Sequence, residues 1–239
     1  MSANTTLTPL EVIASGGFRS VYETVLPAFE KNTGMTVTTR AGASQGDAPT
    51  VIGNQLRRGV AADVVIMSRE GLDELIAEGL IIAQSVVDLA STPTGVAVRA
   101  GAALPDITTV EAFKQTLLRA TSVAFPASTT GFYLVKKLFP RLGIAEALAP
   151  KSSTKGAAAV ASGEVEIAIR PTSELLNVAG IHYVGPIPEA LQFISVFSAA
   201  IVAGSQRIDA AQQLIDFLAS EQTTHAIRES GMAATWSAG

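Results

Sequence analysis

Apolar and polar residues alternate along the first third of the chain in blocks that predict strands and helices in turn. Residues 10–14 are apolar enough for a short buried strand, which the glycines that follow Ser15 end. Apolar residues then recur at helical spacing, as Val21, Tyr22, Val25, Leu26 and Phe29. Ser20 and Glu23 have the spacing of a capping box at the start of that helix, and Gly34 is placed to end it.

The same order recurs twice before residue 80. A strand is predicted at 35–39 and a helix at 50–58, followed by a continuously apolar strand at 63–66. Ser68 is placed to cap a third helix, which Gly79 is placed to end. Three strand–helix units in succession predict an α/β sheet with parallel strands.

The second half of the chain continues the alternation. Strands are predicted at 94–98, 122–125 and 165–169, and Thr108 with Glu111 predicts the start of a helix that runs to Leu117. The apolar stretch 193–202 is a candidate for a strand that returns to the first lobe, and two amphipathic helices follow it. We therefore expect two lobes, one made of 1–92 plus 195–239 and the other of 93–194.

Composition narrows the classes of function. A hydrophobic fraction of 48% with 16% charged residues excludes disorder as the main state, and a net charge of -4 argues against nucleic-acid binding. The absence of cysteine excludes disulfides, thiolate zinc sites and cysteine nucleophiles. His182 and His225 lie far apart in sequence, so we expect neither a metal nor a cofactor.

The sequence leaves two cellular compartments as alternatives. No apolar run is long enough for a membrane span, and the first six residues lack the pattern of a secretory signal. The chain is then either cytoplasmic or a mature exported protein whose signal has been removed.

Four loops that precede predicted helices suit an anionic ligand. They combine hydroxyls and small residues with the free backbone N–H groups of a helix start, which bind anions. In open α/β sheets such loops gather at the carboxyl ends of the strands. For each loop the alternative is an ordinary helix cap. The candidates are Ser15, Gly16, Ser44, Gln45, Ser128, Thr129 and Thr130, and a fourth loop spans 153–156.

Three arginines add positive charge near these loops. Arg19 follows the first loop, Arg69 follows the third strand, and Arg170 ends the predicted strand 165–169. A guanidinium at the end of a strand can hold a carboxylate or phosphate through two parallel hydrogen bonds. For each arginine the alternative is a surface ion pair with a nearby acidic residue.

No catalytic motif identifies a reaction. The chain has no G-x-S-x-G elbow, no P-loop and no G-x-G-x-x-G fingerprint. Asp63 and Glu174 fit structural roles, as a loop anchor and as a charge at a helix start. No residue is assigned as catalytic.

The order and spacing of several segments resemble the type II periplasmic binding proteins, in their molybdate-binding-protein-like branch. The resemblance covers nearly the whole chain. It rests on Ala14-Ser15-Gly16, on 27–34 (PAFEKNTG), on 62–66 (ADVVI), on 163–169 (GEVEIAI) and on 211–220 (AQQLIDFLAS).

The resemblance implies two Rossmann-like α/β lobes, joined by a two-strand hinge, with a ligand cleft between the lobes. It matches Ser15 and Ser44 to hydroxyls that hold an oxyanion, and 127–128 to a backbone contact in the second lobe. Ser153 falls near another such contact. It also implies a monomer in the periplasm that hands its ligand to the membrane subunit of an ABC transporter.

One departure from the family pattern changes the expected ligand. Arg170-Pro171 stands where the family has an aromatic ligand contact. Because molybdate sites of this fold use neutral donors, an arginine there favours a larger organic anion with two or three carboxylates, and molybdate is the less favoured ligand.

The resemblance leaves three functions to weigh. The first is a solute-binding protein for a di- or tricarboxylate. The second is an enzyme of the aconitate isomerase type, which some proteins of this branch are and which moves a proton on a carbon next to a carboxylate. His182, Glu174, Lys155 and an activated hydroxyl are then candidate bases, none singled out. The effector domain of a regulator ranks last, because no DNA-binding segment is present.

Overall fold

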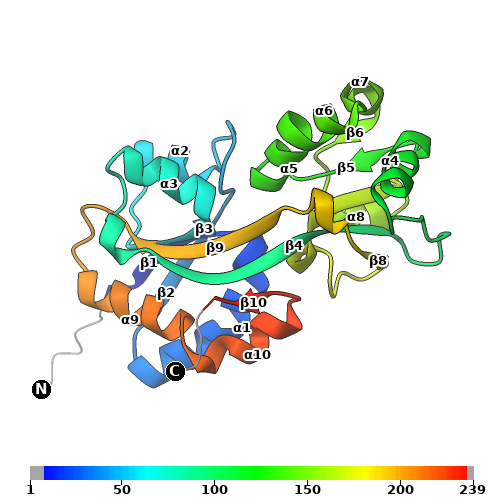
Figure 1. The fold of residues 1–239 in the computed structure, drawn as a ribbon. Coiled ribbons are helices and arrows are strands. Elements are labelled where there is room, and N and C mark those ends of the chain that lie inside the picture. Colours follow the sequence, from blue (N-terminus) through cyan, green and yellow to red (C-terminus); the bar gives the residue numbers. More distant parts are fainter. Residues whose placement is uncertain (1–7, 236–239) are drawn as a thin grey trace, which may run out of the picture. The chain divides into compact units, whose positions relative to one another are not determined.

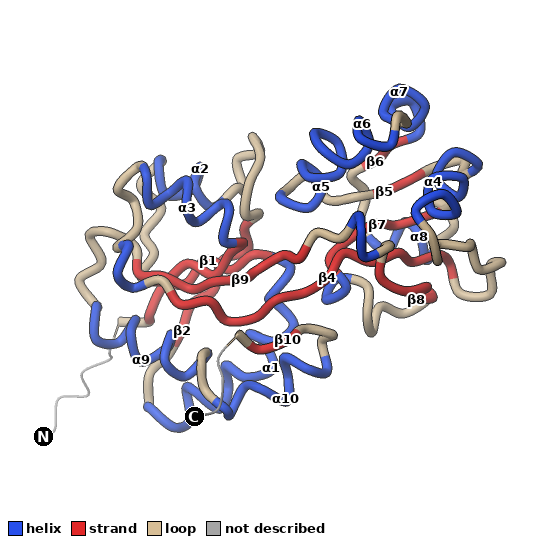
Figure 2. The backbone as a smooth tube through the Cα atoms, viewed as in Figure 1, coloured by secondary structure: helices blue, strands red, loops and turns tan. Residues whose placement is uncertain are grey.

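The computed structural model describes residues 8–235, which divide into two compact units. Unit 1 contains residues up to Ala90, then Val196–Glu229 and the segment from Ala234 on, and unit 2 contains Ser91–Ser195 and Ser230–Ala233. The chain passes from unit 1 into unit 2 within one strand and returns within another, β4 (Val87–Arg99) and β9 (Ile194–Ile201). Figures 1 and 2 show both strands as long continuous segments.

Unit 1 is a sheet with helices on both faces. Its strands stand in the order β2-β1-β3-β9, with β1 parallel to β2 and β3, and β9 antiparallel to β3. Besides β9, the elements are β1 (Leu10–Ser15), α1 (Gly16–Thr33), β2 (Val37–Gly42), α2 (Ile52–Arg57), β3 (Val64–Ser68), α3 (Arg69–Ala77), α9 (Ile208–Leu218) and α10 (Glu221–Glu229).

Side chains alternate between the two faces of this sheet. Ile13, Val65 and Met67 pack against α2 and α3, whereas α1, α9 and α10 cover the opposite face (Figure 1). On that second face the rings of Phe29 and Phe217 lie 5.5 Å apart. Because β1, β2 and β3 are parallel, their carboxyl ends lie along one edge of the sheet.

Unit 2 is built around the order β4-β7-β5-β6, with β8 also paired to β4. β7 runs antiparallel to β4 and parallel to β5. The elements are α4 (Val110–Arg119), β5 (Val123–Ala124), α5 (Thr129–Tyr133), α6 (Phe139–Leu142), α7 (Ala145–Leu148), β6 (Ser152–Ser153), α8 (Ala157–Ala161), β7 (Ile167–Pro171) and β8 (Ile181–Pro186). The short strand β10 (Ala233–Ala234) pairs with β4, and the boundary between the two units falls within it. A π-helical segment, Leu134–Leu138, joins α5 to α6.

Two apolar clusters fill unit 2 on opposite faces of its sheet. Val96 and Ile169 belong to the larger cluster, with the helices from α4 to α7. Ala97, Ala168 and Val160 of α8 belong to the smaller one. The π-helical segment and α8 thus lie on different sides of β7, and Arg170, next to Ile169, points to the face of the smaller cluster.

Several predicted boundaries are wrong. Helix α1 begins at Gly16 with Ser15 as its cap residue, so Ser20 and Glu23 lie inside the helix and form no capping box. The residue that caps α4 is Thr109, whose side chain accepts a hydrogen bond from the Ala112 N–H at 3.1 Å. Strand β4 starts at Val87, whereas the sequence predicted a strand only from residue 94.

Candidate functional site

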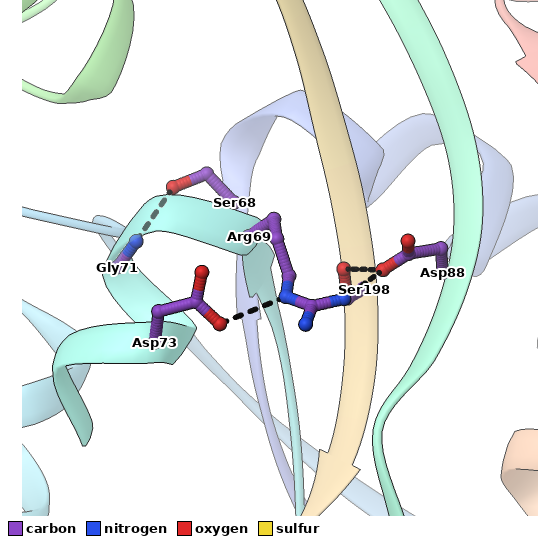
Figure 3. A network of polar contacts seen from close by, with 6 residues as sticks. All are labelled: Ser68, Arg69, Gly71, Asp73, Asp88 and Ser198. Atoms are coloured by element: carbon purple, nitrogen blue, oxygen red, sulfur yellow. Dashed lines mark hydrogen bonds and ion pairs between the residues drawn. The ribbon is translucent and has the colours of Figure 1, made fainter. Parts of the chain in front are cut away.

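The carboxyl edge of the unit 1 sheet gathers three serines. Ser15 ends β1, Ser44 follows β2 and Ser68 ends β3. The side chain of Ser68 accepts the N–H of Gly71 and thereby caps α3, as predicted (Figure 3). All three residues are buried, and parallel pairing brings their strand ends together.

Ser15 is the least satisfied of these hydroxyls. The residue is 3% exposed, and its Oγ has no hydrogen-bond partner among the residues that the structure describes. It caps α1 through its backbone only, because its side chain makes no capping bond. Next to it, a methyl group placed on Gly16 would meet no atom within 4 Å. A buried hydroxyl without a partner at the start of an 18-residue helix is suited to bind an anionic ligand.

Ser44 is held against the start of α3. Its Oγ accepts a hydrogen bond from the Ser68 N–H at 2.9 Å, which leaves its own proton for another acceptor. A Cβ on Gly71 would lie 2.5 Å from the Ser44 carbonyl oxygen, so the close approach requires glycine. Gln45 donates to Glu74 at 2.6 Å. Ser44 is therefore fixed within the unit, and its neighbour Gln45 is engaged by an acidic side chain.

The unit 1 arginines are bonded to carboxylates of their own unit. Arg19 pairs with Glu23 at 2.6 Å, and both side chains are more than half exposed. Arg69 donates to Asp73 at 2.8 Å and to Asp88 at 3.0 Å (Figure 3). The hydrogen bond to Asp73, followed by the one to Asp88, raises the pKa of the Arg69 guanidinium. For both arginines the structure therefore has the ion pair that the sequence left open as an alternative.

In unit 2, the hydroxyl loop lies at the start of α5. Ser128 is the cap residue of α5, and Thr129 and Thr130 form its buried first turn. The Thr130 and Ser195 hydroxyls lie 3.3 Å apart, within hydrogen-bond reach. A Cβ on Gly131 would lie 1.7 Å from the Pro126 carbonyl oxygen, so this loop is tightly folded against the helix start.

Arg170 projects from β7 close to its carboxyl end. Its Nη1 donates to Glu174, and the side chains are 13% and 21% exposed. Its Nε is buried and has no acceptor among the described residues. An arginine N–H that loses water without gaining a partner costs about 1–3 kcal/mol. A ligand carboxylate at Nε would remove that cost.

Glu174 was expected to be a charge at a helix start, or one of several candidate bases, and its contact with Arg170 was not predicted. The sequence contained a signal for this contact, because an arginine and a glutamate four residues apart can form an ion pair. His182 lies on β8 and is exposed, and Lys155 pairs with Glu164 on the surface. Among residues 8–235 no three histidine or acidic side chains gather as metal ligands would. No helix in that range is long and apolar enough to cross a membrane.

Comparison with known proteins shows the family to which the chain is related. The model of the bacterial extracellular solute-binding proteins matches residues 10–233. An aconitate isomerase of Pseudomonas sp. is 41% identical over 230 residues, which are 95% of this chain and 88% of that protein.

Solved structures of similar fold include the sulfate-binding protein SubI of Mycobacterium tuberculosis H37Rv, with a TM-score of 0.75, 20% identity, and coverage of 95% of this chain and 87% of that one. The periplasmic molybdate-binding protein of Azotobacter vinelandii has a TM-score of 0.71, 17% identity, and coverage of 94% and 98%. These matches confirm the resemblance to periplasmic binding proteins and their two-lobed α/β fold. The chain belongs to the bacterial extracellular solute-binding protein family.

Proposed function

We propose that this protein binds aconitate and interconverts its cis and trans isomers. The observation that carries the proposal is the 41% identity, over 95% of the chain, to an aconitate isomerase. The sequence alone favoured solute binding. Identity at this level over 95% of the chain favours the enzyme instead.

The chemistry of the candidate residues supports a polycarboxylate. In the part of the chain that the structure describes, Arg170 has an N–H without an acceptor, and Ser15 has a hydroxyl without a partner at a helix start. Both types of donor bind carboxylates well, the guanidinium through charge-assisted bonds. The expectation that one anion contacts residues of both lobes stays a prediction, as do the roles of Ser44, Gln45, Ser128, Thr129 and Thr130. Arg19 and Arg69 form ion pairs at exposed positions, and within residues 8–235 neither has a buried N–H that lacks an acceptor, as Arg170 has, so we leave them out of the proposed site.

The isomerisation needs only a proton to move. Aconitate has a methylene carbon and a vinylic carbon on either side of its central carbon, and each of these two carbons bears a carboxylate. Loss of a methylene proton gives an allylic carbanion, and return of a proton to the former vinylic carbon shifts the double bond. A cation next to a carboxylate stabilises the negative charge that develops in this transition state.

A second candidate is a solute-binding protein that delivers a polycarboxylate to an ABC transporter in the periplasm. The family match over residues 10–233 favours this alternative. Both candidates predict binding, and only the first predicts conversion.

One experiment separates the two candidates. The purified protein is mixed with a large excess of trans-aconitate, and cis-aconitate is quantified by chromatography over time. Titration calorimetry on the same protein measures binding of citrate, cis- and trans-aconitate, sulfate and molybdate. Product in excess of protein supports the isomerase. Tight binding of a tricarboxylate without product supports the transport protein, and binding of molybdate or sulfate alone contradicts both.

A further inference from the structure

The turn after β7 places a carboxylate directly against Arg170. Glu174 is the last residue of a 3-10 turn, Thr172–Glu174, and its Oε2 accepts a hydrogen bond from Nη1 of Arg170. In every other arginine–carboxylate pair of the described residues, both side chains are at least 40% exposed. The Arg170–Glu174 pair, at 13% and 21%, is largely shielded from water but not fully buried.

The residues that flank Glu174 are fixed by packing. Thr172 is 4% exposed, and its hydroxyl lies 3.1 Å from that of Tyr183. Leu175 is 1% exposed, and its N–H donates to the Thr172 carbonyl at 3.0 Å. The turn that carries Glu174 is therefore fixed by contacts before and after this residue. A catalytic group needs such a fixed position, because it must meet one particular substrate atom.

From this arrangement we propose that Glu174 is the general base of the isomerisation, an inference that rests on the proposed aconitate isomerase function. Arg170 has one N–H bonded to Glu174 and another, at Nε, that has no acceptor within residues 8–235. A substrate carboxylate bound at Nε would share the guanidinium with Glu174. One guanidinium would then hold both the substrate carboxylate and Glu174, which keeps the Glu174 carboxylate near the bound substrate.

The proposed step is a proton shift that balances without any other reactant. The Glu174 carboxylate takes one proton from the methylene carbon, and the electron pair of the broken C–H bond spreads over the three-carbon allylic system and its carboxylates. The resulting carboxylic acid then returns the proton to the former vinylic carbon. The new double bond joins the former methylene carbon to the central carbon, and Glu174 is again a carboxylate.

Other candidate bases fit less well. His182 is exposed on β8, and Lys155 is exposed and paired with Glu164. His225 is 85% exposed on α10. A serine or threonine hydroxyl needs a second group to activate it, whereas a carboxylate is already a base.

The test compares Glu174→Gln and Glu174→Asp with a matched control, Glu78→Gln. Glu78 also pairs with an arginine, Arg57, but lies in α3's C-terminal turn in unit 1 and outside the candidate site. Turnover of trans-aconitate gives kcat. Calorimetry with propane-1,2,3-tricarboxylate, the saturated analogue that cannot isomerise, gives Kd.

Glu174→Gln should lower kcat by roughly 100-fold to 10,000-fold, the usual contribution of a general base, and should change Kd by less than about threefold. Glu174→Asp keeps a carboxylate and should retain intermediate turnover, and Glu78→Gln should match the native protein. A Glu174→Gln variant with native kcat, or with a large loss in Kd and unchanged kcat, would overturn the assignment. Native protein that binds the analogue but converts no aconitate would instead refute the proposed function, and the Glu174 assignment with it.

Discussion

Replacing Arg170 with alanine should weaken both the folded state and ligand binding, for separable reasons. The substitution leaves the Glu174 carboxylate, which is 21% exposed, without its partner. A polar group stranded in this way costs about 1–3 kcal/mol. Full burial would cost more, but both side chains keep some contact with water. For a chain of this length each kcal/mol lowers Tm by about 2–4 °C.

The expected loss of affinity is larger. Removing one partner of a desolvated, hydrogen-bonded charge pair costs about 2–5 kcal/mol. At 1.4 kcal/mol for each factor of ten, this corresponds to roughly a 30-fold to several-thousand-fold rise in Kd. Calorimetric titration with propane-1,2,3-tricarboxylate measures Kd, and thermal unfolding without ligand measures Tm.

The double variant Arg170→Ala with Glu174→Ala separates the two effects. It strands no carboxylate, so its Tm should recover most of what the single variant loses. Its affinity should stay low, because the guanidinium is still missing. An Arg170→Ala protein that binds with native affinity would remove Arg170 from the site. A double variant as unstable as the single one would show that stranding Glu174 is not the cause of the lost stability.

Four further outcomes follow from the geometry. Ser15→Ala should raise Kd by roughly 10-fold to 100-fold without lowering Tm, because its Oγ has no partner among residues 8–235; a lower Tm would contradict this. Gly131→Ala should cost about 1–3 kcal/mol through the clash with Pro126, while Gly156→Ala, in open space, should leave thermal unfolding unchanged. Asp88→Ala should lower Tm more than Asp73→Ala, because both Arg69 and the buried Ser198 lose an acceptor (Figure 3). Burial raises the pKa of Tyr22 to about 12, so its contribution to stability should be lost as pH rises from about 10 to about 12, and Tyr22→Phe should flatten that fall in alkaline unfolding.

Patterns formed by residues close together in the sequence predicted the fold well. The apolar periodicity from Val21 to Phe29 predicted α1, and Gly34 ends that helix with a positive φ of 72°. Ser68 caps α3 as expected, because a serine at the end of a buried strand can accept the first free N–H groups of the next helix. The two-lobed α/β class follows from such local alternation and is confirmed by the solved structures.

Boundaries were harder to predict where two residues compete for one role. Thr108 and Thr109 are both good cap residues, and the outcome depends on Asp106, which accepts the N–H and hydroxyl of Thr108 and leaves Thr109 as the cap. The predicted strand 94–98 began just after Pro93, yet β4 continues through this residue, because a strand tolerates proline where no N–H is needed. Strands of two residues, such as β5 and β6, are too short to show any period.

The candidate site depended on contacts that spacing alone does not reveal. The positions of Ser15, Ser44 and Arg170 at strand ends could be predicted, because the ends of parallel strands share an edge. The engagement of Arg69 by Asp88, 19 residues away, could not, since it depends on how α3 and β4 meet. Burial could not be predicted from the spacing either. Burial is what distinguishes the Arg170–Glu174 pair from the exposed Arg19–Glu23 pair.

The most direct test of the isomerase starts from both ends of the reaction. Pure cis-aconitate and pure trans-aconitate are each incubated with about one protein molecule per thousand substrate molecules, and proton NMR follows both isomers. The account predicts that the two mixtures converge on the same cis-to-trans ratio. If both samples keep their starting isomer while calorimetry shows that the protein binds it, the protein is a binding protein and the proposed catalysis is wrong.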